Sequence, residues 1–210
     1  FGICAVPLII LAVGLVQSTS KLSQQETTLT ELIHANQEIV DNTQLTDKKL
    51  LKTINNVVGL TREETVFSSN SSITFIGDQS LLAIANELTT IYPNAVMHAT
   101  TIAQVTDLAS TINELKAKNL LHDTVVLMFG ANSAFTQGQL EKQIFLVTTT
   151  TSKTWRDDVN AVYKAISEKY SNVHVLDWNE YSKDQDWFYS HKSYVTEVGA
   201  HEEALFFAKK

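Results

Sequence analysis

Cysteine and clusters of basic residues are the clearest absences from this sequence. The only cysteine is Cys4, so the chain cannot form an intrachain disulfide or a cysteine-based metal site. The formal charge is −7 and no cluster of lysine and arginine is present, which makes nucleic acid a poor candidate for a partner. We also expect neither a metal nor another cofactor, because the histidines lack the spacing of metal ligands; those considered are His98, His122, His174 and His201.

What is present is an ordinary globular composition. Hydrophobic residues make up 44% of the chain and charged residues 19%, which argues against a wholly disordered protein. A length of 210 residues is sufficient for one well-buried domain and an extension. Changes in the apolar pattern divide the chain into three parts, residues 1–16, 17–71 and 72–210.

The first part, Phe1–Val16, is an uncharged apolar stretch of 16 residues. A helix that spans a membrane needs about 20 apolar residues, so we interpret this stretch as the end of a transmembrane helix. A signal segment is one alternative, but it would carry a basic leader and a small-x-small cleavage site. A buried core helix is the other, but the polar linker that follows argues against it. We therefore expect the protein to be held at the cell membrane.

Residues 17–71 are predicted to form a helical stalk. Asp41, Asn42 and Thr43 separate two stretches with helical apolar spacing, and Gly59 is the expected end of the second helix. We interpret the stalk as a spacer that packs partly on the following domain; a coiled coil is the alternative, although the heptads are few. The apolar positions are Leu29, Leu32, Ile33, Ile39, Val40, Leu50, Leu51, Ile54, Val57 and Val58.

Residues 72–210 alternate between short apolar runs and amphipathic stretches. This alternation is typical of a parallel sheet that helices cover on both faces. We predict a three-layer, flavodoxin-like α/β domain with five strands in the order 2-1-3-4-5, whose ligands bind at the carboxyl ends of the strands. The expected strands are Ile73–Ile76, Ala95–Met97, Thr124–Phe129, Ile144–Thr148 and Val173–Asp177. The main expected helices are Leu81–Tyr92, Gln104–Lys118, Trp155–Tyr170 and Thr196–Lys209.

Distinctive residues lie at the ends of these strands. They are Gly77-Asp78-Gln79-Ser80, Gly130-Ala131-Asn132-Ser133 and, before the last helix, residues 188–195. In this arrangement the chain resembles the extracytoplasmic SGNH-hydrolase-like domain of the peptidoglycan O-acetyltransferases, which follows membrane helices and a helical stalk. The resemblance implies a domain on the extracytoplasmic side of the cell membrane that transfers acetyl groups to a glycan. Its other landmarks are Gly59-Leu60-Thr61, Ile73–Ile76, Tyr92–Val96, Phe145–Thr148 and Val175–Trp178.

The resemblance also implies a catalytic apparatus. The family's reaction uses a serine nucleophile after Gly-Asp, a histidine base, an aspartate three residues before that histidine, and a glycine and an asparagine in the oxyanion hole. In this sequence these positions hold, in the same order, Gln79, Tyr194, His191, Ile102 and Asn132. Only the Asn132 oxyanion donor is retained. Glutamine is not a usable nucleophile and tyrosine, with a reference pKa of about 10, is a poor base at neutral pH. We therefore predict a catalytically degenerate domain.

The third crossover of the sheet is unusually short. Only 11 residues lie between Asn132 and Ile144. They must form a loop, a helix at about Thr136–Gln143 and a return loop, whereas such a crossover usually takes about a dozen residues or more. The resemblance implies a longer segment here, so we expect about two or three turns of the crossover helix to be missing.

Two alternative functions stay open. An active transferase or esterase would use Ser80 as nucleophile, His191 as base, and Asp184 or Asp186 to orient the base. Ser80, however, lies one residue beyond the turn that aims the nucleophile, a rotation of about 100° on a helix. The second alternative is a membrane-anchored module that only binds cell-wall glycan. The expected partners are the peptidoglycan glycan or an active acyltransferase, together with the membrane.

Overall fold

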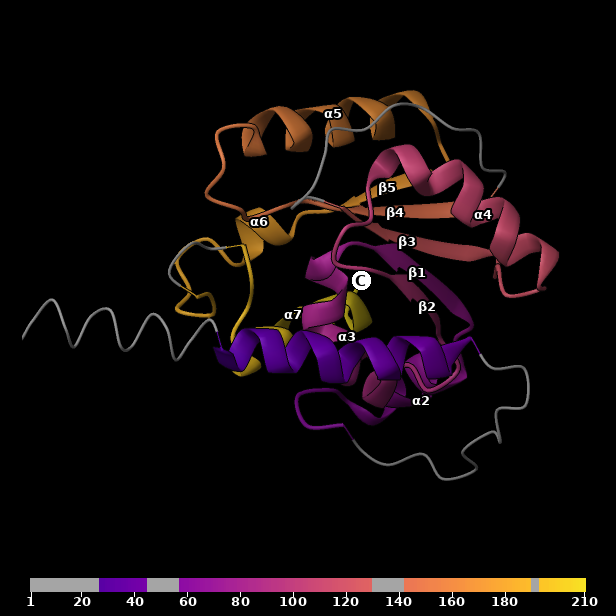
Figure 1. Ribbon diagram of the computed structural model, residues 1–210, viewed down its shortest axis with the longest axis horizontal. Coiled ribbons are helices and arrows are strands. Elements are labelled where there is room, and N and C mark those ends of the chain that lie inside the picture. The colour runs from indigo at the N-terminus through magenta and orange to yellow at the C-terminus, as the bar shows by residue number, and fades with distance from the viewer. Residues whose placement is uncertain (1–26, 45–56, 130–141, 190–192) are drawn as a thin grey trace, which may run out of the picture.

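The computed structural model describes residues 27–44, 57–129, 142–189 and 193–210. At its centre is a parallel sheet of five strands in the order β2-β1-β3-β4-β5 (Figure 1), which confirms the predicted order. Neighbouring strands are in register at the candidate site, where Gly77 of β1 lies between Ala99 of β2 and Met128 of β3. The strands are β1 (Ile73–Gly77), β2 (Val96–Ala99), β3 (Thr124–Met128), β4 (Gln143–Val147) and β5 (Val173–Leu176).

Helices cover both faces of the sheet and give the molecule three layers (Figure 1). α3 and α7 pack on one face, and α4 and α5 on the other. Side chains of β3 alternate between the two cores, since Val126 and Met128 join the first and Val125 and Leu127 join the second. Burial on both faces explains why the strands are continuous apolar runs. The helices are α3 (Gln79–Ile91), α4 (Leu108–Ala117), α5 (Arg156–Lys169) and α7 (Glu197–Ala208).

Residues 27–43 form a helix that packs on the same side of the sheet as α3. Its C-terminal end covers the edge strand β2, whose outer backbone groups would otherwise lack partners in the sheet. The Thr43 hydroxyl accepts a hydrogen bond of 2.7 Å from the Met97 N–H, and Gln44 Nε2 donates one of 2.9 Å to the Met97 carbonyl. Side chains of the predicted stalk thus continue the hydrogen bonding of the sheet.

The helical boundary in the stalk differs from the expected one. The sequence predicts a break at Asp41, Asn42 and Thr43, but the helix continues through all three. Thr43 explains the difference, because its hydroxyl donates to the Val40 carbonyl at 2.7 Å and also binds the backbone of Met97. The prediction of a break at these residues is therefore wrong, and most of the second predicted stalk helix, residues 45–56, lies outside the described residues.

A further stalk helix, α2 (Arg62–Asn70), is absent from the sequence predictions. It begins with a capping box, in which Glu64 N–H donates to the Thr61 hydroxyl at 3.2 Å and Thr61 N–H donates to the Glu64 carboxylate at 2.7 Å. Gly59, which precedes it, has a φ of 90°, a conformation that glycine adopts without strain. α2 contacts both α3 and α7, so this part of the stalk also packs on the domain.

Other differences from the predicted elements are local. Of the expected crossover helix Thr136–Gln143, residues 136–141 lie outside the described ranges. Its predicted C-terminal end is wrong, because Gln143 begins β4 and pairs with Thr124 of β3. A 3-10 turn, Val105–Asp107, precedes α4, and a short helix, α6 (Trp178–Tyr181), follows β5. The remaining boundaries agree to within a residue or two.

Nothing within the described ranges is a membrane-spanning candidate, since no helix there is both long and apolar enough. Phe1–Val16, the predicted end of a transmembrane helix, lies outside those ranges. The division at residues 16 and 71 therefore stays a prediction.

The helix formed by residues 27–43 is part of the folded domain, because its Val40 is fully buried in the core. Experiments on folding and activity accordingly need the stalk as well as the sheet.

Candidate functional site

The chain turns from β1 into α3 at Gly77 and Asp78. A Cβ atom on Gly77 would lie 2.5 Å from the Met128 carbonyl oxygen, so β1 and β3 can approach this closely only because the residue is glycine. Asp78 is fully buried and caps α3, since its Oδ1 accepts a hydrogen bond of 2.8 Å from the Ser80 N–H. The turn therefore holds Gln79, the first residue of α3, at the carboxyl edge of the sheet.

Gln79 and Tyr194 meet at this edge, although they are far apart in the sequence. The side chain of Gln79 lies beside the hydroxyl of Tyr194, close enough for hydrogen bonding to it to lower the pKa of the phenol. Tyr194 lies in the segment before α7, where Phe188 and Val195 form an isolated antiparallel bridge. Burial raises the pKa of Tyr194, and the negative charge of Asp78 raises it further. The phenol is therefore neutral at physiological pH. The pair can connect the loop to α3, but it cannot act as nucleophile and base.

Ser80, the nucleophile of the alternative hypothesis, is half-buried close to this pair. Its backbone N–H is bound to the Asp78 carboxylate. In the part of the chain that the structure describes, no histidine ring is hydrogen-bonded to Ser80, and the histidines that form such bonds have other partners. Asp184 and Asp186, the expected orienting residues, are exposed. His191, the expected base, lies outside the described residues. The described residues thus bring together no nucleophile–base pair at Ser80.

The remaining positions that the resemblance singles out are Ile102 and Asn132. Ile102 lies in the turn after β2 and is 80% exposed, and its side chain has no hydrogen-bond donor. Asn132 lies outside the described residues. Of the five family positions, the structure therefore describes three and brings two of them, Gln79 and Tyr194, into contact.

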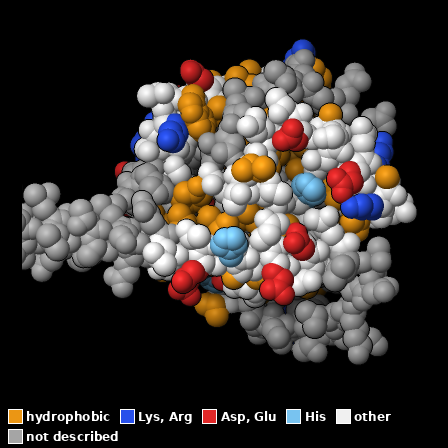
Figure 2. Space-filling view, in the orientation of Figure 1, with side chains coloured by type: hydrophobic (Ala, Val, Ile, Leu, Met, Phe, Trp, Pro, Cys, Tyr) orange, Lys and Arg blue, Asp and Glu red, His pale blue; other side chains and the backbone are white. Residues whose placement is uncertain are grey.

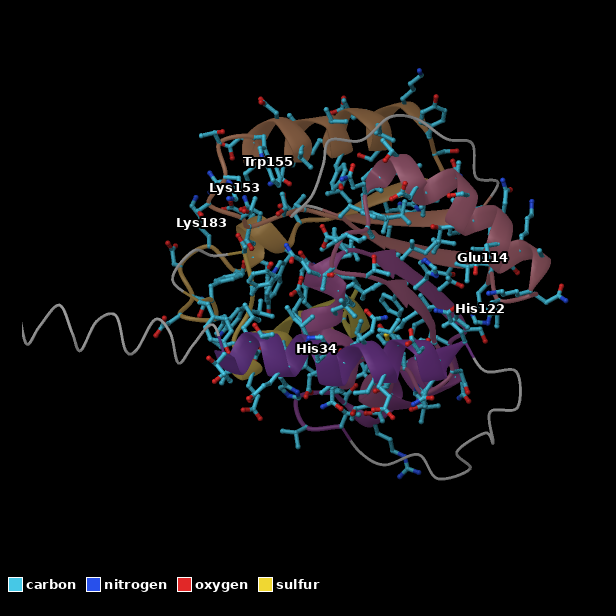
Figure 3. All side chains as sticks on the ribbon, viewed as in Figure 1. His34, Glu114, His122, Lys153, Trp155 and Lys183 are labelled. Carbon is cyan, nitrogen blue, oxygen red and sulfur yellow. The ribbon has the colours of Figure 1, made fainter. Side chains whose placement is uncertain are left out.

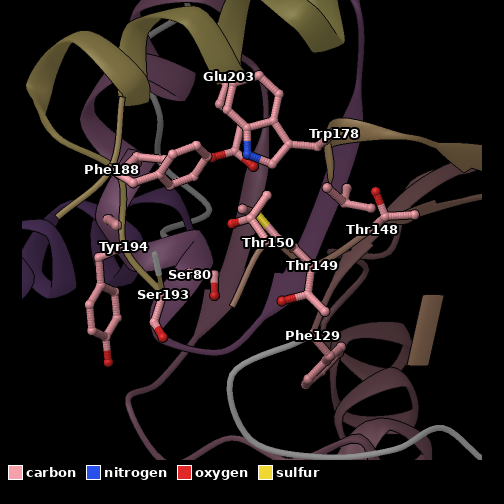
Figure 4. A pocket seen from close by; sticks show the side chains of 14 residues that line it. Ser80, Phe129, Thr148, Thr149, Thr150, Trp178, Phe188, Ser193, Tyr194 and Glu203 are labelled. Carbon is pink, nitrogen blue, oxygen red and sulfur yellow. The ribbon is translucent and has the colours of Figure 1, made fainter. Parts of the chain in front are cut away.

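A small cavity opens beside Ser80 and Tyr194 at the carboxyl ends of β3 and β4 (Figure 4). The space available to the centre of a water molecule is about 30 Å³, which is enough for about two or three waters. The cavity therefore combines apolar walls with several hydroxyl groups. The apolar walls come from Ala83, Met128, Phe129, Val147, Trp178, Phe188 and Val195, and the hydroxyls from Ser80, Thr148, Thr149, Thr150, Ser193 and Tyr194.

Glu203 of α7 also lines this cavity, and its carboxyl group points into it (Figure 4). The residue is 2% exposed, and Oε1 has no hydrogen-bond partner among the described residues. Burial raises the pKa of the carboxyl well above its ordinary value, which favours the neutral acid. The sequence analysis misses Glu203. Its helical spacing could have indicated burial, because Glu203 shares the buried face of α7 with Ala200, Ala204 and Phe207.

Neither the surface charge on the face shown in Figure 2 nor the metal-ligating residues of the described ranges offer a competing site. Acidic and basic side chains are scattered over the face in Figure 2, without a continuous basic patch. Figure 3 shows His34 on the first described helix and His122 at the far end of the sheet. Across the described ranges, no group of three or more His, Cys, Asp and Glu residues is arranged to hold a metal ion.

Comparison with curated proteins finds similarity to peptidoglycan O-acetyltransferases. It is 31% identical over 136 residues to the peptidoglycan O-acetyltransferase OatA of Listeria monocytogenes, a match that covers 60% of this chain and 21% of the relative. It is 28% identical over 130 residues to the O-acetyltransferase OatA of Staphylococcus aureus, with 58% of this chain and 22% of the relative covered. The chain is thus similar to peptidoglycan O-acetyltransferases over 58–60% of its length. It spans about a fifth of the length of these OatA relatives, and no protein-family model matches it.

A solved OatA structure has the same fold. It is the C-terminal catalytic domain of the Streptococcus pneumoniae peptidoglycan O-acetyltransferase A, determined with a methylsulfonyl adduct. The TM-score is 0.54 at 19% sequence identity, and the match covers 66% of this chain and 88% of the other. The described domain therefore has the fold of this catalytic domain, and in this chain the fold contains a five-stranded parallel sheet.

Proposed function

We propose that this chain is an OatA-like domain that has lost acyl transfer. The observation that carries the proposal is that the side chain of Gln79 lies beside the hydroxyl of Tyr194, where the resemblance places a nucleophile and its base. Acyl transfer needs a deprotonatable nucleophile, a base that titrates near neutral pH and donors aimed at the oxyanion. A glutamine amide and a neutral phenol meet neither of the first two needs.

Two further observations support the proposal. The position of the oxyanion glycine holds Ile102, a β-branched residue whose side chain is 80% exposed, in place of the glycine that the family has there. Ser80 is tied through its backbone to the Asp78 cap, one residue past the turn that aims a nucleophile in the family. Asn132 by itself could stabilise an oxyanion by about 2.7–4 kcal/mol. That stabilisation has no effect without a nucleophile that creates the oxyanion.

The proposal includes a location and a role. Phe1–Val16 is the end of a membrane helix, and the domain lies on the extracytoplasmic side of the cell membrane, next to the cell wall. The uncharged apolar stretch and the homology to peptidoglycan O-acetyltransferases support this location. In such a position a catalytically silent domain binds the peptidoglycan glycan or assists an active acyltransferase.

Hydrolysis of an activated acetyl ester tests the loss of activity. The 210-residue chain in detergent micelles should hydrolyse the ester no faster than micelles alone, and Ser80→Ala should leave this rate unchanged. The matched control is the catalytic domain of S. pneumoniae OatA, handled in the same way. Wild-type turnover that disappears in Ser80→Ala would contradict the proposal and favour the rearranged enzyme.

Restoring the family residues provides the complementary experiment. Gln79→Ser alone should stay at background, because Tyr194 cannot take the proton of the new hydroxyl. We expect recovery to begin only when Gln79→Ser is combined with His191→Asp and Tyr194→His. Turnover by Gln79→Ser alone would show that another base is in place, and would contradict the assignment of Tyr194 to the position of the base.

A further inference from the structure

The Oε1 atom of the buried carboxyl group of Glu203 has no hydrogen-bond partner among the described residues. Buried polar groups in native structures are nearly always hydrogen-bonded, and an unsatisfied one costs about 1–3 kcal/mol. Glu203 Oε1 is an exception among the described residues, because it is buried and has no hydrogen bond. The carboxyl group also points into a cavity (Figure 4), so the missing partner can come from outside the chain.

The walls of the cavity restrict what that partner can be. The rings of Trp178 and Phe188 flank Glu203 in Figure 4, and Met128 and Val147 add further apolar surface. Ions are costly to bury against such surface, which disfavours both an anion and a cation. Hydroxyl groups, such as those of Thr149 and Thr150, line the same cavity and suit an uncharged polar group.

We propose that the cavity binds a primary carboxamide group, which pairs with the carboxyl group of Glu203 through two hydrogen bonds. A neutral carboxyl group donates through its O–H and accepts through its C=O. A primary carboxamide has a C=O and an N–H on the same side, so the two groups match in a ring of two hydrogen bonds. A trans secondary amide has its N–H on the opposite side and can form only one of these bonds.

This binding site is independent of the proposed loss of acyl transfer. Neither Gln79 nor any other residue assigned to the nucleophile or the oxyanion hole takes part in the pairing with Glu203. Tyr194→His does alter one residue of the cavity wall, so carboxamide binding is measured on chains that keep Tyr194. Restored esterase activity would then bear only on the proposed function, and failure of carboxamide binding only on the site at Glu203.

Small-molecule titrations followed by NMR test the proposal. The chain has three tryptophans, and the indole N–H signal of Trp178 in the cavity wall can be assigned by eliminating Trp155 and Trp187 through substitution by phenylalanine. Acetamide should shift this signal saturably at pH 6. N-methylacetamide, acetate and methylammonium should bind about tenfold or more weakly. Absence of a saturable shift with acetamide, or binding of acetate or methylammonium as tight as that of acetamide, would overturn the proposal.

Variants of Glu203 identify the pairing partner. Glu203→Leu removes both hydrogen bonds and should weaken acetamide binding about tenfold. Glu203→Gln keeps a donor and an acceptor in the same shape, so it should bind acetamide within about threefold of wild type. Glu202→Leu, a change at the half-exposed neighbouring carboxylate, is the matched control and should have no effect. Equal acetamide binding by wild type and Glu203→Leu would place the ligand elsewhere and overturn the proposal.

Discussion

Burial sets the chemistry of two titratable side chains beside the candidate site. It raises the pKa of Tyr194, with a further contribution from the charge of Asp78, and it is the sole cause of the raised pKa of Glu203. Both groups are thereby favoured in their neutral forms. A neutral phenol offers no base to a neighbouring hydroxyl, whereas a neutral carboxylic acid gains the ability to donate a hydrogen bond. The same physical effect thus removes one function and creates the conditions for another.

The raised pKa of Glu203 predicts a stability that depends on pH. Below the ordinary carboxyl pKa of 4.5, Glu203 is protonated in both the folded and the unfolded chain. As the pH rises, the unfolded chain loses this proton first, so the folded state is progressively disfavoured until the pH passes the raised pKa. The free energy of unfolding of wild type relative to Glu203→Gln should therefore fall from pH 4.5 upward.

Urea unfolding at a series of pH values measures this difference. Glu203→Leu, which also removes the unsatisfied oxygen, should be about 1–3 kcal/mol more stable than wild type above neutral pH. Glu202→Gln serves as the control, since its carboxylate is half-exposed. If the free energies of unfolding of wild type and Glu203→Gln differ by the same amount at every pH, the assignment of Glu203 as a buried neutral acid is contradicted.

At the scale of elements, the edge of the sheet depends on the helix formed by residues 27–43. β2 is the outermost strand, and the backbone of Met97 finds its partners in Thr43 and Gln44. Asn36 of the same helix donates a hydrogen bond of 2.6 Å to the Leu82 carbonyl of α3. The helix therefore closes an edge that would otherwise be open to pairing with another chain.

Thr43→Val tests this closure, because valine keeps the shape of threonine and removes only the hydroxyl. Thr43 is 3% exposed, so the Met97 N–H should be left buried without its partner. We expect the free energy of unfolding to fall by about 1–3 kcal/mol, measured by urea unfolding. The matched control is Thr90→Val on α3, where an exposed hydroxyl binds only within its own helix and the loss should stay below about 0.5 kcal/mol. Equal losses in the two variants would contradict the role assigned to Thr43.

At the scale of the whole molecule, the sheet order is the feature that the sequence predicts best. Apolar runs separated by helices allow few arrangements once crossovers must be right-handed, and the structure has the expected one. The end of the first helix at Thr43 and the start of α2 at Thr61 are harder to predict, because each depends on one or two hydrogen bonds rather than on periodicity. The Thr61–Glu64 capping box is a local pattern that marks the start of α2, and the predictions from the sequence do not include it.

The candidate site is also predictable from the sequence only in part. The resemblance to the OatA family supplies the positions Gln79 and Tyr194, and the structure places the two side chains next to each other. The cavity at Glu203 cannot be predicted from strand ends, because it forms where α7 packs against the loop after β4 and the segment before α7. Its composition depends on tertiary packing, which one sequence by itself does not reveal.

Labelling by a sulfonyl fluoride is the most direct measurement of the central claim, that the site holds no activated nucleophile. The solved OatA relative carries a methylsulfonyl adduct, so its catalytic domain is a positive control. The 210-residue chain, treated with methanesulfonyl fluoride at neutral pH and weighed intact by mass spectrometry, should gain no methylsulfonyl group while the control is labelled. A stoichiometric adduct that peptide mapping places on Ser80, and that Ser80→Ala abolishes, would contradict the account.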